Sequence, residues 1–306
     1  AVDKKASDVH IFVSRPPILR IDGELFEIEK MTDLSAKDAE TLVYKILSPE
    51  QQDKFNRNKD LDISYQLPDG QRFRVNCFWE RGNVGLVARL IPKEIPSMED
   101  IGMPKVVYEL MRLNQGLIIV TGPTGCGKST SLAAMLHLIN SEKSVNIVTL
   151  EDPIEFIHEP VKSIIKQRQL GTDMTSFSRG LKYVLRQDPN VIMVGEMRDL
   201  ETIAATLTLA ETGHLVLATL HTPNAAQTID RIIDVFPPYQ QVQIRLQLAL
   251  ALSGVVAQQL IPRKDDNGRI AAREIMINTP AVANLIRENK IVQISSVIQT
   301  SAKEGM

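Results

Sequence analysis

One short segment has the residue types and spacing to hold the phosphates of a nucleotide. Residues 122–129 read Gly-Pro-Thr-Gly-Cys-Gly-Lys-Ser, which fits the pattern G-x-x-x-x-G-K-[ST]. Glycines let backbone N–H groups turn toward phosphate oxygens, and a helix starting there adds the positive end of its dipole. Lys128 would reach the β- and γ-phosphates of ATP, and the Ser129 hydroxyl would ligate Mg²⁺. The expected nucleotide-binding residues are Gly122, Pro123, Thr124, Gly125, Cys126, Gly127, Lys128, Ser129 and Thr130.

Acidic residues follow two other apolar runs. The run 191–195 ends in Glu196, which we expect to hold Mg²⁺ directly or through water. The segment 149–155 carries Glu151 and Glu155, and both are candidates to polarise an attacking water, with Glu155 the favoured base. The ordinary alternatives are an exposed carboxylate at a strand end, a helix cap or a solvated acidic turn.

Two histidines, His214 and His221, flank the apolar run 215–220. They are an odd number of residues apart, so a strand would point them to opposite faces, and no further Cys or His cluster joins them to make a zinc site. One imidazole could report the γ-phosphate while the other bonds to a neighbouring element. A histidine satisfied within the packing is the ordinary alternative.

Arginines could complete the site from an adjacent subunit or domain, as they often do in ring-shaped ATPases. Four of them, Arg72, Arg74, Arg81 and Arg89, crowd the end of the first hundred residues, and Arg231 follows the second histidine. Surface ion pairing is at least as common an explanation for any one of them.

The elements that would position these residues alternate between strand and helix. Apolar runs at 117–120, 145–150, 191–195 and 215–220 alternate with helical patterns at 129–140, 175–186 and 200–211. Such a pattern predicts an α/β domain with a parallel sheet covered on both faces. Ligands bind at the carboxyl ends of such strands, where the phosphate loop, Glu151 and Glu196 are all expected.

The first part of the chain reads as a small α+β domain. Strands are expected at 9–13 and 84–91, with hairpins 18–28 around a primed turn at Asp22-Gly23 and 61–78 around Asp69-Gly70. Ser35 would cap a helix with Ala39, Leu42, Val43, Ile46 and Leu47 on one face. Prolines 92 and 96 mark a linker at 92–104. The expected domains are therefore 1–91 and 105–306.

Composition narrows the class of protein. The chain has 306 residues, 43% of them hydrophobic and 24% charged, with a net charge of −2. Near-neutral charge without aromatic-rich basic patches argues against a nucleic-acid partner. No apolar run is long enough to span a bilayer, and 246–256 reads as core. Only Cys77 and Cys126 are present, so a structural disulfide and a four-cysteine zinc site are not expected, and the cytoplasm is the natural compartment.

Motifs along the whole chain resemble one family. They are residues 6–10 and 17–23 at the start, the "Asp box" Glu151–Glu155, the Walker B segment Val194–Asp199, the "His box" 212–222 with 228–232, and the helix motif 281–287. In these residues the chain resembles the type IV pilus retraction ATPases, within the secretion-type (type II/IV) hexameric ATPases.

The resemblance implies a PAS-like N-terminal domain, a RecA-like P-loop ATPase domain and a homo-hexamer. It implies ATP and Mg²⁺ at the subunit interface, with Arg74, Arg81 and Arg89 at the positions that reach nucleotide. It also implies docking on an inner-membrane pilus platform protein at the inner face of the cytoplasmic membrane, from which the ring drives pilin subunits out of the fibre. Direction of movement comes only from this resemblance, because extension and retraction motors share the hydrolysis site.

Alternative functions remain open at this point. The helix motif begins Ala281-Val282-Ala283 rather than with the commoner variants, which leaves room for an accessory retraction ATPase acting through a partner motor. Cys126 stands where the family often has Ser or Thr, which leaves phosphate binding intact. A non-motor regulatory ring is a second alternative. A nucleic-acid translocase and a small-molecule P-loop kinase are disfavoured by charge and by the lack of an Arg-rich lid.

Overall fold

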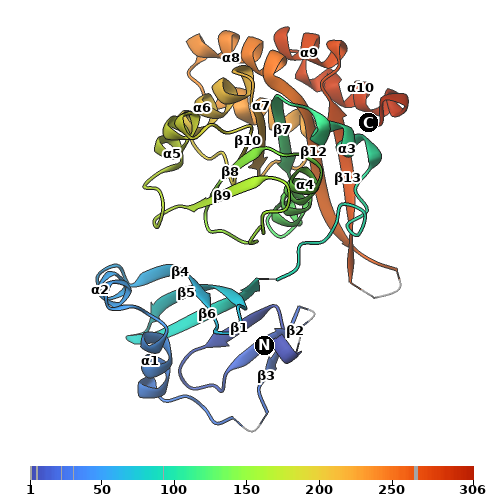
Figure 1. Ribbon diagram of the computed structural model, residues 1–306. Coiled ribbons are helices and arrows are strands. Elements are labelled where there is room, and N and C mark those ends of the chain that lie inside the picture. The colour runs from blue at the N-terminus through green and yellow to red at the C-terminus, as the bar shows by residue number, and fades with distance from the viewer. Residues whose placement is uncertain (1, 5, 22, 30, 92, 265–267) are drawn as a thin grey trace. The chain divides into compact units, whose positions relative to one another are not determined.

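The chain forms two compact units in the computed structural model, Ala1–Glu94 and Ile95–Met306 (Figure 1). The structure describes residues 2–4, 6–21, 23–29, 31–91, 93–264 and 268–306. The expected linker 92–104 is divided between the units, and its Pro92 lies outside the described residues. Met98 and Met103 are buried in the core of the second unit, so this part of the segment packs as part of that unit.

The first unit is an antiparallel sheet in the order β3-β2-β1-β6-β5-β4 with helices on one face. Both predicted hairpins are confirmed as strand pairs, although Asp22 lies outside the described residues. The elements are η1 (Val2–Lys4), β1 (Asp8–Ile11), β2 (Ile18–Ile21), β3 (Glu24–Glu27), α1 (Ala36–Lys45), α2 (Pro49–Asn58), β4 (Asp60–Gln66), β5 (Arg72–Glu80) and β6 (Asn83–Ile91).

Reciprocal capping by a serine and the side chain three residues later starts both α1, at Ser35, and α2, at Ser48. The Ser35 hydroxyl accepts from the N–H of Asp38, whose carboxylate accepts from the Ser35 N–H, and so α1 begins as predicted. Leu42, expected on the buried face of α1, is exposed, because Ala39 and Val43 make the contact with the sheet. α2 was not predicted, because Phe55 is its single buried residue and gives no apolar period.

The second unit contains a sheet in the order β13-β12-β7-β11-β10-β8-β9. Every neighbouring pair is parallel except β12 with β13, so the expected parallel sheet is confirmed for the four predicted runs. Three further strands, β9, β12 and β13, were not predicted. The strands are β7 (Gly116–Thr121), β8 (Asn146–Glu151), β9 (Ile164–Gln169), β10 (Val191–Val194), β11 (Leu215–Leu220), β12 (Leu252–Pro262) and β13 (Arg269–Ile277).

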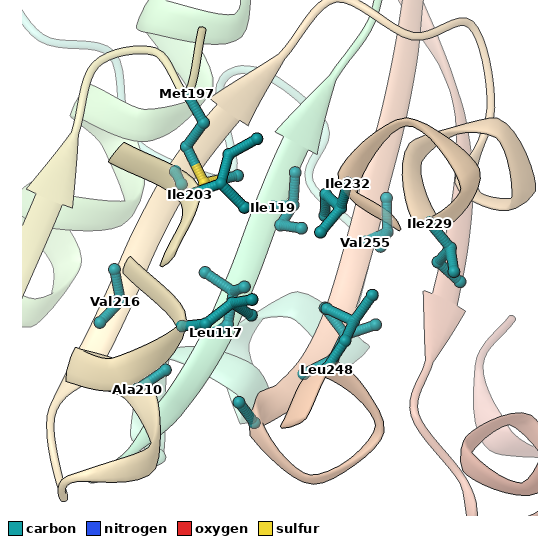
Figure 2. Packing of buried hydrophobic residues seen from close by; sticks show 14 of the residues in the cluster. Leu117, Ile119, Met197, Ile203, Ala210, Val216, Ile229, Ile232, Leu248 and Val255 are labelled. Atoms are coloured by element: carbon teal, nitrogen blue, oxygen red, sulfur yellow. The ribbon is translucent and has the colours of Figure 1, made fainter. Parts of the chain in front are cut away.

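Helices cover both faces of this sheet because residues alternate along each central strand. On β7, Ile118 and Val120 pack with α3 and α4, whereas Leu117 and Ile119 pack with the remaining helices. Figure 2 shows the latter pair among apolar side chains of α6, α7, α8 and β12. The helices are α3 (Lys105–Arg112), α4 (Lys128–Glu142), α5 (Phe177–Val184), η2 (Leu185–Gln187), α6 (Leu200–Glu211), α7 (Ala225–Asp234), α8 (Pro238–Ala251), α9 (Pro280–Arg287), η3 (Ile291–Gln293), α10 (Ile294–Thr300) and η4 (Ala302–Glu304).

The apolar run 246–256 belongs to two elements. It comprises the last turns of α8 and the first residues of β12, and the chain leaves the helical conformation at Leu252. Within the described ranges, no helix is both long enough and apolar enough to cross a bilayer.

Candidate nucleotide site

The phosphate loop connects β7 to α4, as the sequence pattern predicts. Gly127 is the N-cap of α4 with φ +87°, and no described side chain caps it, so the first N–H groups of the helix are available to an anion. Gly122 has φ +142°, and a Cβ there would lie 2.2 Å from the main-chain oxygen of Gln258. A side chain at either position would fill or distort the cradle, so the loop fits a phosphate group.

The Lys128 ammonium lies over this loop. Its Nζ donates to the carbonyl oxygens of Gly122 at 2.9 Å and Pro123 at 3.1 Å, and it lies 3.4 Å from Nδ1 of His221. Burial lowers the pKa of Lys128, while the charges around it, those of Glu196 and Glu155 among them, act in the opposite direction. The lysine is therefore a largely desolvated cation whose present partners are neutral carbonyls, which phosphate oxygens would replace favourably.

Glu196 is the centre of an ionic network at the end of β10. Its carboxylate accepts from Arg198 Nη2 at 2.7 Å and lies 3.3 Å from His221 Nε2, and Arg198 Nη1 lies 3.6 Å from Asp152 Oδ2. Burial alone would raise the pKa of the Glu196 carboxyl, but Arg198 and His221 hold it below its ordinary value. The carboxylate is thus ionised and oriented, as a metal-holding or water-orienting group must be.

Sheet order explains why these side chains meet. The strands β7, β11, β10 and β8 are successive parallel neighbours, and their carboxyl ends lead into the phosphate loop, His221, Glu196 and Glu151 respectively. The expectation that one edge of the sheet collects them therefore follows directly from the topology.

Glu151 and Glu155 differ in their surroundings. Glu151 is buried, and its Oε1 accepts from Thr149 Oγ1 at 2.6 Å and Gln167 Nε2 at 3.0 Å. Burial raises the pKa of Glu151 in spite of these donors. Glu155 is half-buried, and its charge acts on Lys128. Because Glu155 has the more open carboxylate, it remains the favoured candidate for the base, and Glu151 serves better as a fixed anchor of the segment.

Several predicted site residues lie elsewhere. His214 precedes β11 at the end opposite to the phosphate loop, with its Nδ1 3.0 Å from the Leu209 carbonyl oxygen, so it bonds a neighbouring element and does not reach the site. Arg231 is exposed in the last turn of α7.

The other three predicted arginines belong to the first unit. Arg89 Nε donates to Asp8 Oδ1 at 2.8 Å, and Arg74 is the cross-strand neighbour of Arg89. Arg81 Nε lies 4.0 Å from Glu80 Oε1.

Sequence reasoning missed three polar residues that shape the site. Arg198, which lies in the quoted motif two positions after Glu196, was signalled by its charge and spacing but was not assigned. Gln167 and Gln258 lie on β9 and β12, strands that were not predicted. Their amides contact the Asp box segment and the phosphate loop respectively.

Amide side chains hold the coil that follows β8. Gln167 accepts from the N–H of His158 at 2.9 Å and donates to the Phe156 carbonyl at 2.7 Å. Asn140 at the end of α4 donates to the Glu159 carbonyl at 2.8 Å. These bonds fix a segment without secondary structure of its own beside the candidate base.

His158 in this segment makes stability depend on pH. Burial, with the His137 charge adding to it, lowers the pKa of His158 from 6.5 to about 4. The folded pKa lies below the unfolded value, so the stabilisation is complete above pH 6.5 and is lost as pH falls from 6.5 toward 4. We expect a loss of about 3 kcal/mol over this window. Urea unfolding at pH 7.5 and 4.5 should show a smaller loss for His158→Leu than for the natural chain, and equal losses would refute this assignment.

The fold and the site together define a P-loop nucleotide-binding protein: a parallel strand, a glycine-rich loop with lysine over it, a helix, and acidic neighbouring strand ends. The chain belongs to the type II/IV secretion system protein family, whose model matches residues 1–304.

Known proteins similar to this chain give the same family. It is 47% identical to the type IV pilus retractation ATPase PilT of Pseudomonas aeruginosa over 98% of this chain and 87% of the relative. It is 46% identical to a twitching motility protein of Neisseria gonorrhoeae over 95% of this chain and 77% of the relative. A crystal structure of the pilus retraction motor PilT with bound ADP matches with a TM-score of 0.93 and 45% identity, over 98% of this chain and 87% of that one.

Proposed function

We propose that this chain is an ATP-hydrolysing motor that powers retraction of type IV pili and works as a homo-hexamer. The observation that carries the proposal is the row of side chains from Lys128 through His221 to Glu196, directly beside a phosphate loop of the expected form. The similarity to a retraction ATPase and to an ADP-bound retraction motor along nearly the whole chain supports the same assignment.

The residues of this chain would divide the chemistry among them. N–H groups of residues 122–129 and the Lys128 ammonium would hold the phosphates, and Glu155 would orient the attacking water. Mg²⁺, when bound, would neutralise charge on the phosphate oxygens, with Ser129 and, directly or through water, Glu196 as its protein contacts. No group of three or more His, Cys, Asp or Glu side chains in the described ranges could hold a metal alone, which fits a metal bound mainly through phosphates. His221, whose imidazole lies between Lys128 and Glu196, would respond to the γ-phosphate.

We infer the partners of the chain together with this function. A ring of six would dock on an inner-membrane platform protein at the inner face of the cytoplasmic membrane. Arg74, Arg81 and Arg89 of an adjacent subunit would complete the charge at the nucleotide. The accessory alternative, a ring that acts through a paralogous retraction ATPase, predicts low ATP hydrolysis alone and full hydrolysis after the paralogue is added.

A deletion strain tests the proposed function. Cells without this chain should be covered in pili but unable to twitch, because assembly continues while retraction stops. The natural chain should restore twitching, and Lys128→Ala should not. Twitching and surface pili are counted by motility assays and electron microscopy. Bald cells would assign the chain to assembly, and normal twitching would contradict the proposal.

A further inference from the structure

One buried amide, that of Gln258 on β12, holds the phosphate loop from the side of the sheet. Its Nε2 donates to the Cys126 carbonyl at 2.7 Å, and its Oε1 accepts from Ser131 Oγ at 2.8 Å. The residue is 3% exposed. A single side chain therefore fixes both the last residues of the loop and the first turn of α4.

Two glycines of the phosphate loop also lie close to Gln258. A Cβ on Gly122 would lie 2.2 Å from the Gln258 main-chain oxygen, and a Cβ on Gly127 would lie 3.3 Å from Gln258 Nε2. Gln258 thus lies against the glycines at both ends of the loop. Because Cys126 is buried, its carbonyl would lose a donor that water could not readily replace if the amide were removed.

Arg273 joins this amide to the beginning of the second unit. It faces Gln258 in the register between β12 and β13, with Nε 3.5 Å from Gln258 Oε1, and its Nη1 donates to the Gly102 carbonyl at 3.1 Å. The guanidinium bears a permanent charge with fixed donor directions, so it bridges the two acceptors in one geometry.

The segment that Arg273 reaches, residues 97–103, is itself well defined. Ser97 and Asp100 exchange side-chain and backbone hydrogen bonds, and Met98 and Met103 are buried. This segment follows the boundary between the units at Glu94 and Ile95. A contact from the phosphate loop to residues 97–103 therefore reaches the part of the chain through which the first unit is attached.

We propose that Gln258 is a positioning residue of the phosphate loop and that Arg273 couples this loop to residues 97–103, so that nucleotide binding alters the start of the second unit. The proposal rests on the proposed nucleotide site but not on pilus retraction. The carbonyl of Cys126 and the first turn of α4 keep their orientation only while the amide is held, and Arg273 holds it.

ADP affinity tests the positioning role. Gln258→Met removes both amide bonds, and Gln258→Glu keeps the acceptor but loses the donor to Cys126, so each should weaken ADP binding by about tenfold. Arg273→Met should weaken it by about threefold, and the double variant with Gln258→Met should bind no more weakly than Gln258→Met alone. The control is Arg269→Met, an exposed arginine on the same strand, with unchanged affinity. Natural affinity in folded variants, or additive losses in the double variant, would overturn the role.

Hydrogen exchange tests the coupling. ADP should slow exchange at residues 122–130 and 97–103 of the natural chain, and only at 122–130 in Arg273→Met. An equal response at 97–103 in both would refute the coupling. Circular dichroism checks that each variant is folded, and if Gln258→Met is not, the Gln258→Glu and Arg273→Met results decide. Failure of the natural chain to bind ADP would instead reject the proposed function.

Discussion

Replacement of Lys128 by alanine is expected to reduce ATP turnover by about a hundredfold to a thousandfold, because a desolvated cation aimed at developing phosphate charge contributes on this scale. In the structure the ammonium lies over the loop, donates to the carbonyls of Gly122 and Pro123, and lies 3.4 Å from His221 Nδ1. Bound phosphates would supply stronger, charge-assisted partners, so nucleotide affinity should fall together with turnover. Steady-state phosphate release and ADP titration measure the two effects.

Removing the charge of Lys128 should reduce activity without reducing the stability of the fold. Lys128 is 9% exposed, and burial of its ammonium costs free energy in the absence of nucleotide. Lys128→Met, which keeps the chain length without the charge, should therefore unfold at a temperature no lower than the natural chain. The matched control for turnover is Lys143→Ala, which should leave turnover unchanged. Lys143 lies at the other end of α4 and also donates to two carbonyls, those of Arg112 and Leu113. Natural turnover in Lys128→Ala would reject the site.

Glu196→Gln is expected to lose about a hundredfold or more in turnover while nucleotide still binds. The substitution keeps the shape but removes the negative charge that Arg198 and His221 stabilise. A neutral amide holds Mg²⁺ or orients water less well than a carboxylate. Turnover and ADP affinity, measured on the same preparation, separate the two contributions.

Two further variants serve as comparisons for Glu196→Gln. Glu201→Gln changes an exposed carboxylate on α6 and should leave turnover unchanged. His221→Ala should lower turnover by about tenfold with binding retained, because the imidazole lies between Lys128 and Glu196. A His221→Ala protein with natural turnover would remove its sensing role, and a Glu196→Gln protein that no longer binds ADP would place Glu196 in binding.

The parts of the site that lie in strongly apolar strands were predictable. Each of β7, β8, β10 and β11 is a short, mainly apolar run. The phosphate loop, Glu151, Glu196 and His221 lie at or within two residues of the ends of these strands, so both the strands and the chemistry at their ends are visible in the sequence. Their order in the sheet was not visible. Only the pairing of β11 between β7 and β10 brings His221 between the lysine and the glutamate.

The supporting residues could not be predicted, because their strands carry little signal. β9 reads Ile-Ile-Lys-Gln-Arg-Gln, which does not alternate clearly between apolar and polar residues. β12 does not alternate clearly either, and it continues directly from α8, so the sequence does not mark where the strand begins. The roles of Gln167 and Gln258 depend on partners far away in the sequence, at Glu151 and Cys126. A lone glutamine in such a strand gives no indication of what it will contact.

For the histidine pair, the sequence indicated separate roles but not which histidine lies at the site. Spacing indicated that His214 and His221 act separately, and the structure places them at opposite ends of β11. Which of them lies beside the phosphate loop is decided by strand direction: the carboxyl end of β11 lies beside the carboxyl end of β7 in a parallel pair, and only His221 is there.

The most direct test of the account is a crystal structure of this chain with a non-hydrolysable ATP analogue and Mg²⁺. We predict phosphate density at residues 122–129, with Lys128 Nζ moved from the Gly122 and Pro123 carbonyls to the phosphate oxygens. Density for the analogue at another place on the molecule, with Lys128 still bonded to its own loop, would contradict the account.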